Sequence, residues 1–334
     1  MSTNEVESGT GNPFELPPLH PSLFNPTDQE RRFLRWAISP DDETVKSRVF
    51  QIGKEAYEVL PYPCIHAFHY TCLYMRENSV YNELLDLANK YPFPPILLDL
   101  GCLMGTDARN LIRDGYNKSG GQILACDLEQ RFIDLGYKLY QDGPESTHPT
   151  PIRFFTGDIF KMSIAPPTEA TEHGRDLPQN LTLDGVKGKL DFVYAGALFH
   201  LFDEPTQRDL AFRLARLIQM PSDSSGQLPD AIIFGRHAGL DEEGYISGHF
   251  VGGRWGQRYG HSPTSWVSLW KSIYTELYGH EWVEENIQAN AVMQRINTKV
   301  KMLFWSVRIK RSYRENGIVW KRDGSDVPLF VGGT

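Results

Sequence analysis

The chain has 334 residues, of which 40% are hydrophobic and 23% charged, a composition typical of folded proteins and not of disordered ones. Its 34 basic and 42 acidic residues give a formal net charge of −8, and the absence of any basic cluster argues against a nucleic-acid partner. No apolar run approaches the roughly 18 residues of a membrane span, and the start of the chain lacks the pattern of a signal peptide. We therefore expect a soluble, cytoplasmic protein with no membrane partner and with reduced cysteines. Length alone allows one large domain or two ordinary ones.

The first ninety residues predict a tail followed by helices. Residues 1–26 are polar and rich in Pro, Gly and Ser, so we expect a flexible N-terminal tail. Residues 27–92 are expected to form a helical cap over the rest of the protein. The first predicted helix begins at a Thr27-Asp28 cap, which is followed by Glu30. A second helix is predicted over 42–60 and ends at Pro61-Tyr62-Pro63, and a third is predicted over 67–90.

From residue 93 onward, short apolar runs alternate with helical stretches. Such continuous runs are typical of buried parallel strands, and their alternation with helices predicts a parallel sheet covered on both faces. The expected strands cover 95–100, 122–127, 152–156, 190–195 and 230–235, with helices over 106–114, 130–140, 206–220 and 265–277. A last strand, 301–308, is expected at the edge of the sheet.

Two stretches interrupt this domain. Residues 163–188 are polar, contain several Pro and Gly, and predict a surface insertion. Residues 239–263 combine many glycines with Phe250, Trp255 and Tyr259, which suggests a lid or a substrate wall.

The turn after the first strand carries the most informative motif, Asp99-Leu100-Gly101-Cys102-Leu103-Met104-Gly105. Its glycines permit positive φ angles and let a ligand approach the backbone. The spacing differs from the dinucleotide motif G-x-G-x-x-G, and Asp107 at the following helix start would repel a pyrophosphate. A nucleoside ligand without phosphate, such as S-adenosylmethionine, fits better because its sulfonium cation favours nearby acids.

Two further carboxylates follow the next strands. Asp127 lies 26 residues after Gly101, where a carboxylate can accept hydrogen bonds from both ribose hydroxyls. Asp158 could accept from the adenine amino group while Ile159 or Phe160 packs on the ring. Each feature alone could be a turn glycine or a capping Asp, but together they lie at strand ends, where open α/β sheets bind ligands.

These residues resemble the class I S-adenosylmethionine-dependent methyltransferases, and more narrowly the fungal tailoring methyltransferases of meroterpenoid and polyketide pathways. The segments that carry the resemblance are Pro61-Tyr62-Pro63-Cys64-Ile65, Leu98-Asp99-Leu100-Gly101-Cys102 through Gly105, Asp127-Leu128, Phe132-Ile133-Asp134-Leu135-Gly136-Tyr137, Gly157-Asp158-Ile159-Phe160 and Leu198-Phe199-His200-Leu201-Phe202. The resemblance departs from the family pattern at His66-Ala67-Phe68-His69-Tyr70, where the substrate should bind.

The resemblance implies a Rossmann-like fold with a mostly parallel seven-stranded sheet over 93–334, helices on both faces, and the cap at 27–92. It also implies S-adenosylmethionine as cofactor, S-adenosylhomocysteine as product, and no metal. The residues expected at the cofactor are Asp99, Gly101, Cys102, Gly105, Asp127, Leu128, Asp158, Ile159, Phe160 and Ala195.

His200 is the candidate catalytic residue, because it follows the fourth strand on the same rim as the three aspartates. It could be a general base, a donor that orients the substrate, or a helix-start packing residue. The candidate substrate contacts are Tyr62, His66, His69, Arg236 and Trp255, where Arg236 would pair with an acidic acceptor. Partly buried histidines, a surface arginine and core aromatics are the alternative interpretations.

The sequence thus predicts a small-molecule O-methyltransferase of secondary metabolism that methylates a carboxyl or hydroxyl group by in-line transfer. The expected substrate is a polycyclic or aromatic natural-product intermediate, and a homodimer is one state that the sequence allows. The alternative is an enzyme of the same fold that binds S-adenosylmethionine but catalyses cyclisation or rearrangement of a polyketide or terpenoid intermediate. A nicotinamide oxidoreductase and a non-catalytic interaction module are the other classes considered.

Overall fold

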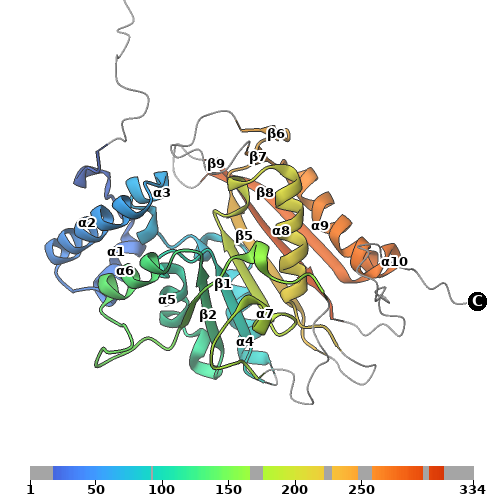
Figure 1. The fold of residues 1–334 in the computed structure, drawn as a ribbon, viewed down its shortest axis with the longest axis horizontal. Helices are drawn as coiled ribbons and strands as arrows, with labels where there is room; N and C mark the ends of the chain where they lie inside the picture. Colours follow the sequence, from blue (N-terminus) through green and yellow to red (C-terminus); the bar gives the residue numbers. More distant parts are fainter. Residues whose placement is uncertain are drawn as a thin grey trace, which may run out of the picture.

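The computed structural model describes residues 18–91, 93–165, 176–221, 228–246, 258–295 and 301–311 (Figure 1). Its helices are α1 (Asp28–Ala37), α2 (Asp42–Val59), α3 (Pro63–His66), α4 (Tyr81–Lys90), α5 (Thr106–Arg113), α6 (Gln130–Tyr140), α7 (Leu183–Val186), α8 (Glu204–Leu217), α9 (Pro263–Tyr278) and α10 (His280–Asn286). Its strands are β1 (Ile96–Leu100), β2 (Gln122–Asp127), β3 (Arg153–Thr156), β4 (Phe192–Gly196), β5 (Ala231–His237), β6 (Gly244–Tyr245), β7 (Tyr259–Gly260), β8 (Ile287–Arg295) and β9 (Lys301–Ile309). Among these helices, none is long and apolar enough to cross a membrane.

A seven-stranded sheet with the order β3-β2-β1-β4-β5-β9-β8 forms the centre of the molecule. Strands β1 to β5 pair in parallel, whereas β9 is antiparallel to both β5 and β8. Each residue of β1 is buried, as expected for a strand with helices on both sides. The predicted Rossmann-like class I methyltransferase fold is therefore confirmed.

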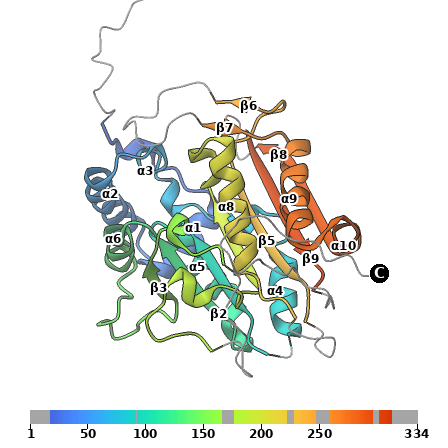
Figure 2. The ribbon, with the colours of Figure 1, turned by 45° about the vertical axis from the view of Figure 1, so that its right-hand side comes forward.

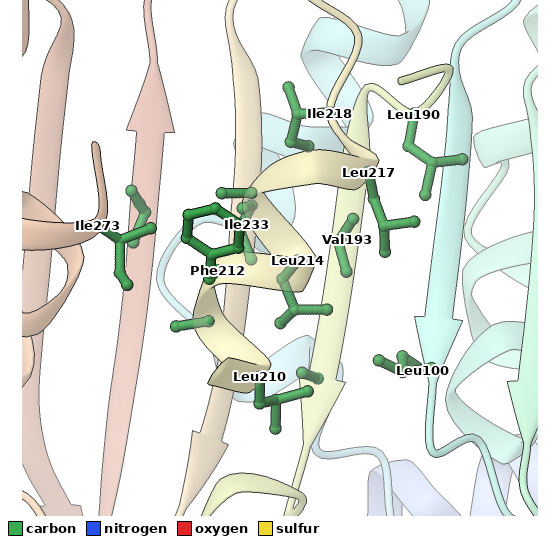
Figure 3. Close-up of a cluster of buried hydrophobic side chains, with 14 of the residues drawn as sticks. Leu100, Leu190, Val193, Leu210, Phe212, Leu214, Leu217, Ile218, Ile233 and Ile273 are labelled. Carbon is green, nitrogen blue, oxygen red and sulfur yellow. The ribbon is translucent and has the colours of Figure 1, made fainter. Parts of the chain in front are cut away.

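The two faces of the sheet have separate cores. On one face, α8 and α9 pack over alternate residues of the strands, including Leu100, Val193 and Ile233 (Figures 2 and 3). On the other face, α4 and α5 cover residues such as Leu97 and Phe192. Because successive strand residues point to opposite faces, both cores draw on the same short apolar runs.

The antiparallel edge of the sheet differs from the edge that the sequence predicts. The strand at 301–309 is not an edge strand, because β8 pairs along its full length and forms the edge instead. Residues 302–307 of β9 are all buried, whereas β8 alternates between exposed and half-buried residues. A half-buried strand without a run of β-branched residues carries a weak sequence signal, so β8 was missed.

The cap is helical in its described part, but the helix expected over 67–90 is wrong. Two short 3₁₀ turns, η2 (His69–Thr71) and η3 (Met75–Glu77), precede α4, and Phe68 adopts a left-handed φ of 57° that ends the helical path. The capping box at the start of α1 is confirmed: Thr27 N donates to Glu30 Oε2 at 2.7 Å, and Glu30 N donates to Thr27 Oγ1 at 3.3 Å. The cap lies beside α6 (Figure 1) and shares one hydrophobic cluster with it.

The structure describes part of each of the two stretches that interrupt the domain, 163–188 and 239–263. Within 163–188, residues 166–175 lie outside the described part, but Leu183 and Val186 of α7 are buried in the main core, so this end of the stretch is not a surface insertion. Within 239–263, β6 and β7 pair with each other, and residues 247–257 lie outside the described part. Phe250 and Trp255 are among those outside.

Candidate functional site

A cavity of about 540 Å³ lies between the cap and the carboxyl ends of the parallel strands. This volume falls within the roughly 300–1,000 Å³ that is typical of small-molecule sites. The cap contributes residues from Leu60 to Tyr74, and the five parallel strands, the turns that follow them and the starts of helices α5, α6 and α8 contribute the rest. The cavity therefore occupies the place where open α/β sheets bind their ligands.

The glycine turn after β1 forms the floor of this cavity. Gly101, with φ of 76°, and Cys102 both donate their N–H to the Cys126 carbonyl, at 2.8 and 3.1 Å. Leu103 also has a positive φ, 51°, and its N–H donates to Asp127 Oδ2 at 2.8 Å. Strand ends β1 and β2 are thus joined through the turn, which leaves Asp99, Gly101 and Cys102 at the cavity surface.

Asp127 is fixed by two backbone hydrogen bonds. Besides Leu103 N at Oδ2, its Oδ1 accepts from Glu129 N at 3.0 Å. Burial raises the pKa of this carboxyl, while the backbone donors act in the opposite direction. A carboxylate held in this way at the end of β2 can still accept hydrogen bonds from a ligand with paired hydroxyls. Leu128 lines the cavity and is 60% exposed.

The end of β3 adds Asp158 and the 3₁₀ turn η5 (Ile159–Lys161). Asp158 Oδ1 accepts from Phe160 N at 3.0 Å and so caps this turn. Ile159 and Phe160 line the cavity, and the Phe160 ring stands edge-on to Phe202 at 5.1 Å between centroids. These side chains offer an apolar slot beside a carboxylate.

A polar wall formed by Tyr74, Asp107 and Arg236 lies at the other end of the cavity, beyond β1. Asp107, on the first turn of α5, accepts from Met75 N at 3.0 Å, and burial raises the pKa of its carboxyl to about 7 even though the Arg236 charge opposes the shift. The Arg236 guanidinium lies over the Tyr74 ring at 3.6 Å, and Tyr194 of β4 lies close to both charged groups. From the sequence, Asp107 was expected only to repel a pyrophosphate. Its position two residues after the last glycine was the signal for a site residue.

His200 lies in the 3₁₀ turn η6 (Phe199–Leu201) and lines the cavity. Burial lowers the pKa of its imidazole to about 3, with the charges of Arg236 and Arg258 acting in the same direction. Its buried Nδ1 has no hydrogen-bond partner among the described residues. His69 also lines the cavity, and burial lowers its pKa as well. Both imidazoles are therefore neutral at physiological pH.

Most of the residues expected at the site line this one cavity, but three of the described ones do not. Gly105 caps α5 with φ of 68°, and a Cβ there would meet the Phe154 ring at 2.6 Å, so this glycine permits packing and not ligand approach. Ala195 is buried within β4. The His66 ring lies outside the cavity lining, with Nε2 at 3.2 Å from the Pro18 carbonyl. Trp255 lies outside the described residues.

Of the four cysteines, only Cys102 was expected at the site. Cys64, Cys72, Cys102 and Cys126 are all free thiols, and all four line the cavity. Burial raises the pKa of each, to about 11 for Cys64, which keeps them protonated and poorly nucleophilic. In the described part of the chain, no three His, Cys, Asp or Glu side chains are grouped so that they could hold a metal ion.

The sheet order and the position of the cavity are those of the class I methyltransferase fold. Residues 19–71 match the family model described as the meroterpenoid methyltransferase N-terminal domain. Two fungal relatives are similar over a longer stretch: the O-methyltransferase phiE of Fungal sp. (strain ATCC 74256) is 30% identical over 227 residues, and the O-methyltransferase atr3 of Stereocaulon alpinum is 29% identical over 231. The methyltransferase ausD of Aspergillus calidoustus is 31% identical over 164 residues.

These matches cover 68, 64 and 49% of this chain and 64, 59 and 50% of the respective relatives. The chain thus spans less than two thirds of the length of each of these three relatives. Among solved structures, magnesium protoporphyrin IX methyltransferase from Synechocystis PCC 6803 aligns over 84% of this chain and 93% of its own, with 11% identity and a TM-score of 0.41. The resemblance to fungal methyltransferases is therefore confirmed by the sequence matches.

Proposed function

We propose that the protein is an S-adenosylmethionine-dependent O-methyltransferase that acts on a small-molecule secondary metabolite. The observation that carries this proposal is Asp127, a half-buried carboxylate held by two backbone N–H groups at the end of β2, beside the Gly101 turn. The similarity to fungal O-methyltransferases supports the same reaction class.

The described residues fit the cofactor by their chemistry. Asp127 would accept from the ribose hydroxyls, Asp158 from the adenine amino group, and Ile159 and Phe160 would pack on the adenine ring. Asp99, Gly101, Cys102 and Leu128 would line the same part of the site. When bound, S-adenosylmethionine supplies a methyl group on a positively charged sulfur, which is open to in-line displacement.

The acceptor would enter from the cap side, where Tyr62 and His69 line the cavity. A neutral His200 with a pKa of about 3 is a weak base, so we assign it the role of orienting donor. In the tautomer that carries its proton on Nε2, the His200 ring would donate a hydrogen bond to the acceptor oxygen. A carboxylate acceptor needs no base, and this favours carboxyl over hydroxyl methylation.

The organisation proposed for the chain follows from this site. Residues 27–92 would serve as a cap and lid for the acceptor, residues 93–334 would form the cofactor-binding domain, and residues 1–26 would be a flexible tail. The stretch at 239–263, which includes Trp255, would add a wall to the acceptor site. We further predict that the acceptor is polycyclic or aromatic and that the reaction needs no metal. A cytoplasmic location is also a prediction, and a homodimer is a state that the sequence allows.

Calorimetric titration with S-adenosylmethionine tests the cofactor assignment. We expect saturable binding by the purified protein and its loss in Asp127→Ala, because the ribose would lose its acceptor. The exposed-site variant Asp42→Asn serves as the control and should bind as the parent protein does. Absence of binding by the parent, or unchanged binding by Asp127→Ala, would contradict the proposal.

The products identify the reaction. Incubation with fungal extracts should give a compound heavier by one methyl group together with S-adenosylhomocysteine, and mild alkali should cleave the product if it is a methyl ester. A transformed compound without S-adenosylhomocysteine would instead support cyclisation or rearrangement.

A further inference from the structure

Arg236 is the only arginine or lysine among the described residues that line the cavity. Its side chain is 9% exposed, its guanidinium lies over the Tyr74 ring at 3.6 Å, and its buried Nε has no hydrogen-bond partner in the described part of the chain. A buried cation without an anionic partner is costly, so the position calls for an anion supplied by a ligand.

Asp107 stands close to Arg236 without neutralising it. The described ion pairs, which join groups within 4.0 Å, do not include these two residues, although the Arg236 charge opposes the rise that burial causes in the pKa of Asp107. Asp107 also lies close enough to Asp99 to raise the pKa of that carboxyl. The wall therefore presents one cation and one carboxyl group that are near each other and not paired. A ligand that carries both charges, as an α-amino acid does, matches this arrangement.

The order of the strands gives the direction in which the cofactor extends. Asp158 follows β3, Asp127 ends β2 and Asp99 lies in β1, while Tyr194 and Arg236 lie in β4 and β5. If the adenine lies at β3 and the ribose at β2, the remaining part of the molecule extends toward β1, β4 and β5. That part is the amino-acid end, which carries an ammonium and a carboxylate.

We propose that Arg236 and Asp107 form the receptor for the amino-acid end of S-adenosylmethionine, and that this contact fixes residues 74 and 75 of the cap. The carboxylate pairs with Arg236 and the ammonium with Asp107. The inference rests on the proposed function and replaces the expectation that Arg236 pairs with an acidic acceptor.

The same two side chains already hold the cap. Asp107 accepts from Met75 N at 3.0 Å, and Arg236 lies on the ring of Tyr74. Met75 is fully buried, and Tyr74 lines the cavity next to the acceptor space. Cofactor contact with Asp107 and Arg236 therefore stabilises one wall of the acceptor site, which implies that the cofactor binds before the acceptor.

Three ligands that differ in their ammonium and carboxylate groups test the contacts with Arg236 and Asp107 one at a time. S-Adenosylhomocysteine has both groups, its decarboxylated analogue keeps only the ammonium, and 5′-methylthioadenosine has neither. Arg236→Gln should weaken S-adenosylhomocysteine roughly 10- to 100-fold, the range for a hydrogen bond between charged groups, and leave the other two ligands unchanged. Asp107→Asn should weaken both ligands that carry the ammonium and leave 5′-methylthioadenosine unchanged. Asn keeps an acceptor oxygen for Met75 N.

Two further variants control for charge and folding. Arg236→Lys, which keeps the positive charge, should recover part of the lost affinity. Arg208→Gln removes a cation from the exposed side of α8, where it pairs with Glu276, and should bind all three ligands as the parent does. Equal weakening of all three ligands by Arg236→Gln, or unchanged binding of S-adenosylhomocysteine, would overturn the inference. The second result would assign Arg236 to the acceptor.

Hydrogen exchange of the parent protein tests the link to the cap without any substitution. S-Adenosylhomocysteine should slow amide exchange over residues 69–78, whereas saturating 5′-methylthioadenosine should not. Equal protection by both ligands would refute the coupling. If the parent binds none of the three ligands, the proposed function itself fails; if it binds all three equally, only this inference fails.

Discussion

At the scale of single residues, burial decides the chemistry of the site more than residue type does. Asp107 and His200 are both ordinary titratable side chains in the sequence. Burial raises the pKa of Asp107 to about 7 and lowers that of His200 to about 3. The sequence could place both near the strand ends, but the pKa of each depends on neighbours such as Arg236 that come from distant parts of the chain.

Asp107 makes stability depend on pH. Its folded pKa of about 7 exceeds the ordinary value of 3.8, so the stability it contributes is fully present below about pH 3.8 and is lost as pH rises through 7. Asp107→Asn does not titrate and should gain stability relative to the parent as pH rises from 5 to 8, by up to roughly 1 kcal/mol per pH unit. Urea unfolding at several pH values measures this difference.

Asp41 provides a control, because its contribution to stability should change with pH in the opposite direction. Its carboxylate caps α2 and accepts from Thr44, which lowers its pKa, so its contribution is lost as pH falls. Asp41→Asn should therefore lose stability relative to the parent at higher pH. A difference between Asp107→Asn and the parent that stays constant from pH 5 to 8 would show that Asp107 does not titrate in this range.

At the scale of elements, one glycine explains why a sequence motif was informative. Gly136 lies in α6, within the segment Phe132 to Tyr137 that carried much of the family resemblance. A Cβ at this position would stand 2.5 Å from the Met104 carbonyl oxygen in the glycine turn. Helix α6 therefore packs directly on the backbone of the turn that forms the cavity floor.

Gly136→Ala should destabilise the protein and weaken cofactor binding. Alanine gains roughly 1 kcal/mol over glycine inside a helix, but the clash is with backbone and forces α6 away, at a cost of about 1–3 kcal/mol. Gly244→Ala is the matched control, because a Cβ at Gly244 meets nothing within 4 Å. Thermal unfolding and titration with S-adenosylhomocysteine measure both effects. An alanine variant as stable as the parent, with equal affinity, would disprove the close packing.

The elements themselves were predictable to different degrees. The five parallel strands are short apolar runs, and each was placed to within two residues because a continuous apolar run bounded by turn residues is a strong strand signal. The predicted helix over 67–90 was wrong because the left-handed turn at Phe68 depends on contacts with Phe24 and Tyr70, which no local pattern reveals. The polar wall was missed for the same reason: Tyr74, Asp107 and Arg236 meet only in the folded protein.

At the scale of the whole molecule, the two ends of the sheet have different roles. The carboxyl ends of the parallel strands form the cavity, while a buried ion pair lies at the opposite end. Asp191 precedes β4, and its Oδ1 lies 2.9 Å from Arg311 Nη1, both side chains being fully buried. Asp191 Oδ2 also accepts from Ile96 N at 2.8 Å, and Arg311 Nη2 donates to Tyr91 at 3.0 Å. This network joins the start of β1 to the residues after β9.

Asp191→Asn should therefore affect stability and not the site. It would leave the Arg311 charge buried without its partner, which typically costs about 3–5 kcal/mol. Asp42→Asn breaks the exposed pair with Arg35 and should leave the free energy of unfolding almost unchanged, because solvent screens that pair. Urea unfolding gives the stabilities, and calorimetry on the folded variant should give the parent's affinity for S-adenosylhomocysteine. A loss of affinity in folded Asp191→Asn without a loss of stability would contradict this separation, because it would show that the two ends of the sheet are coupled.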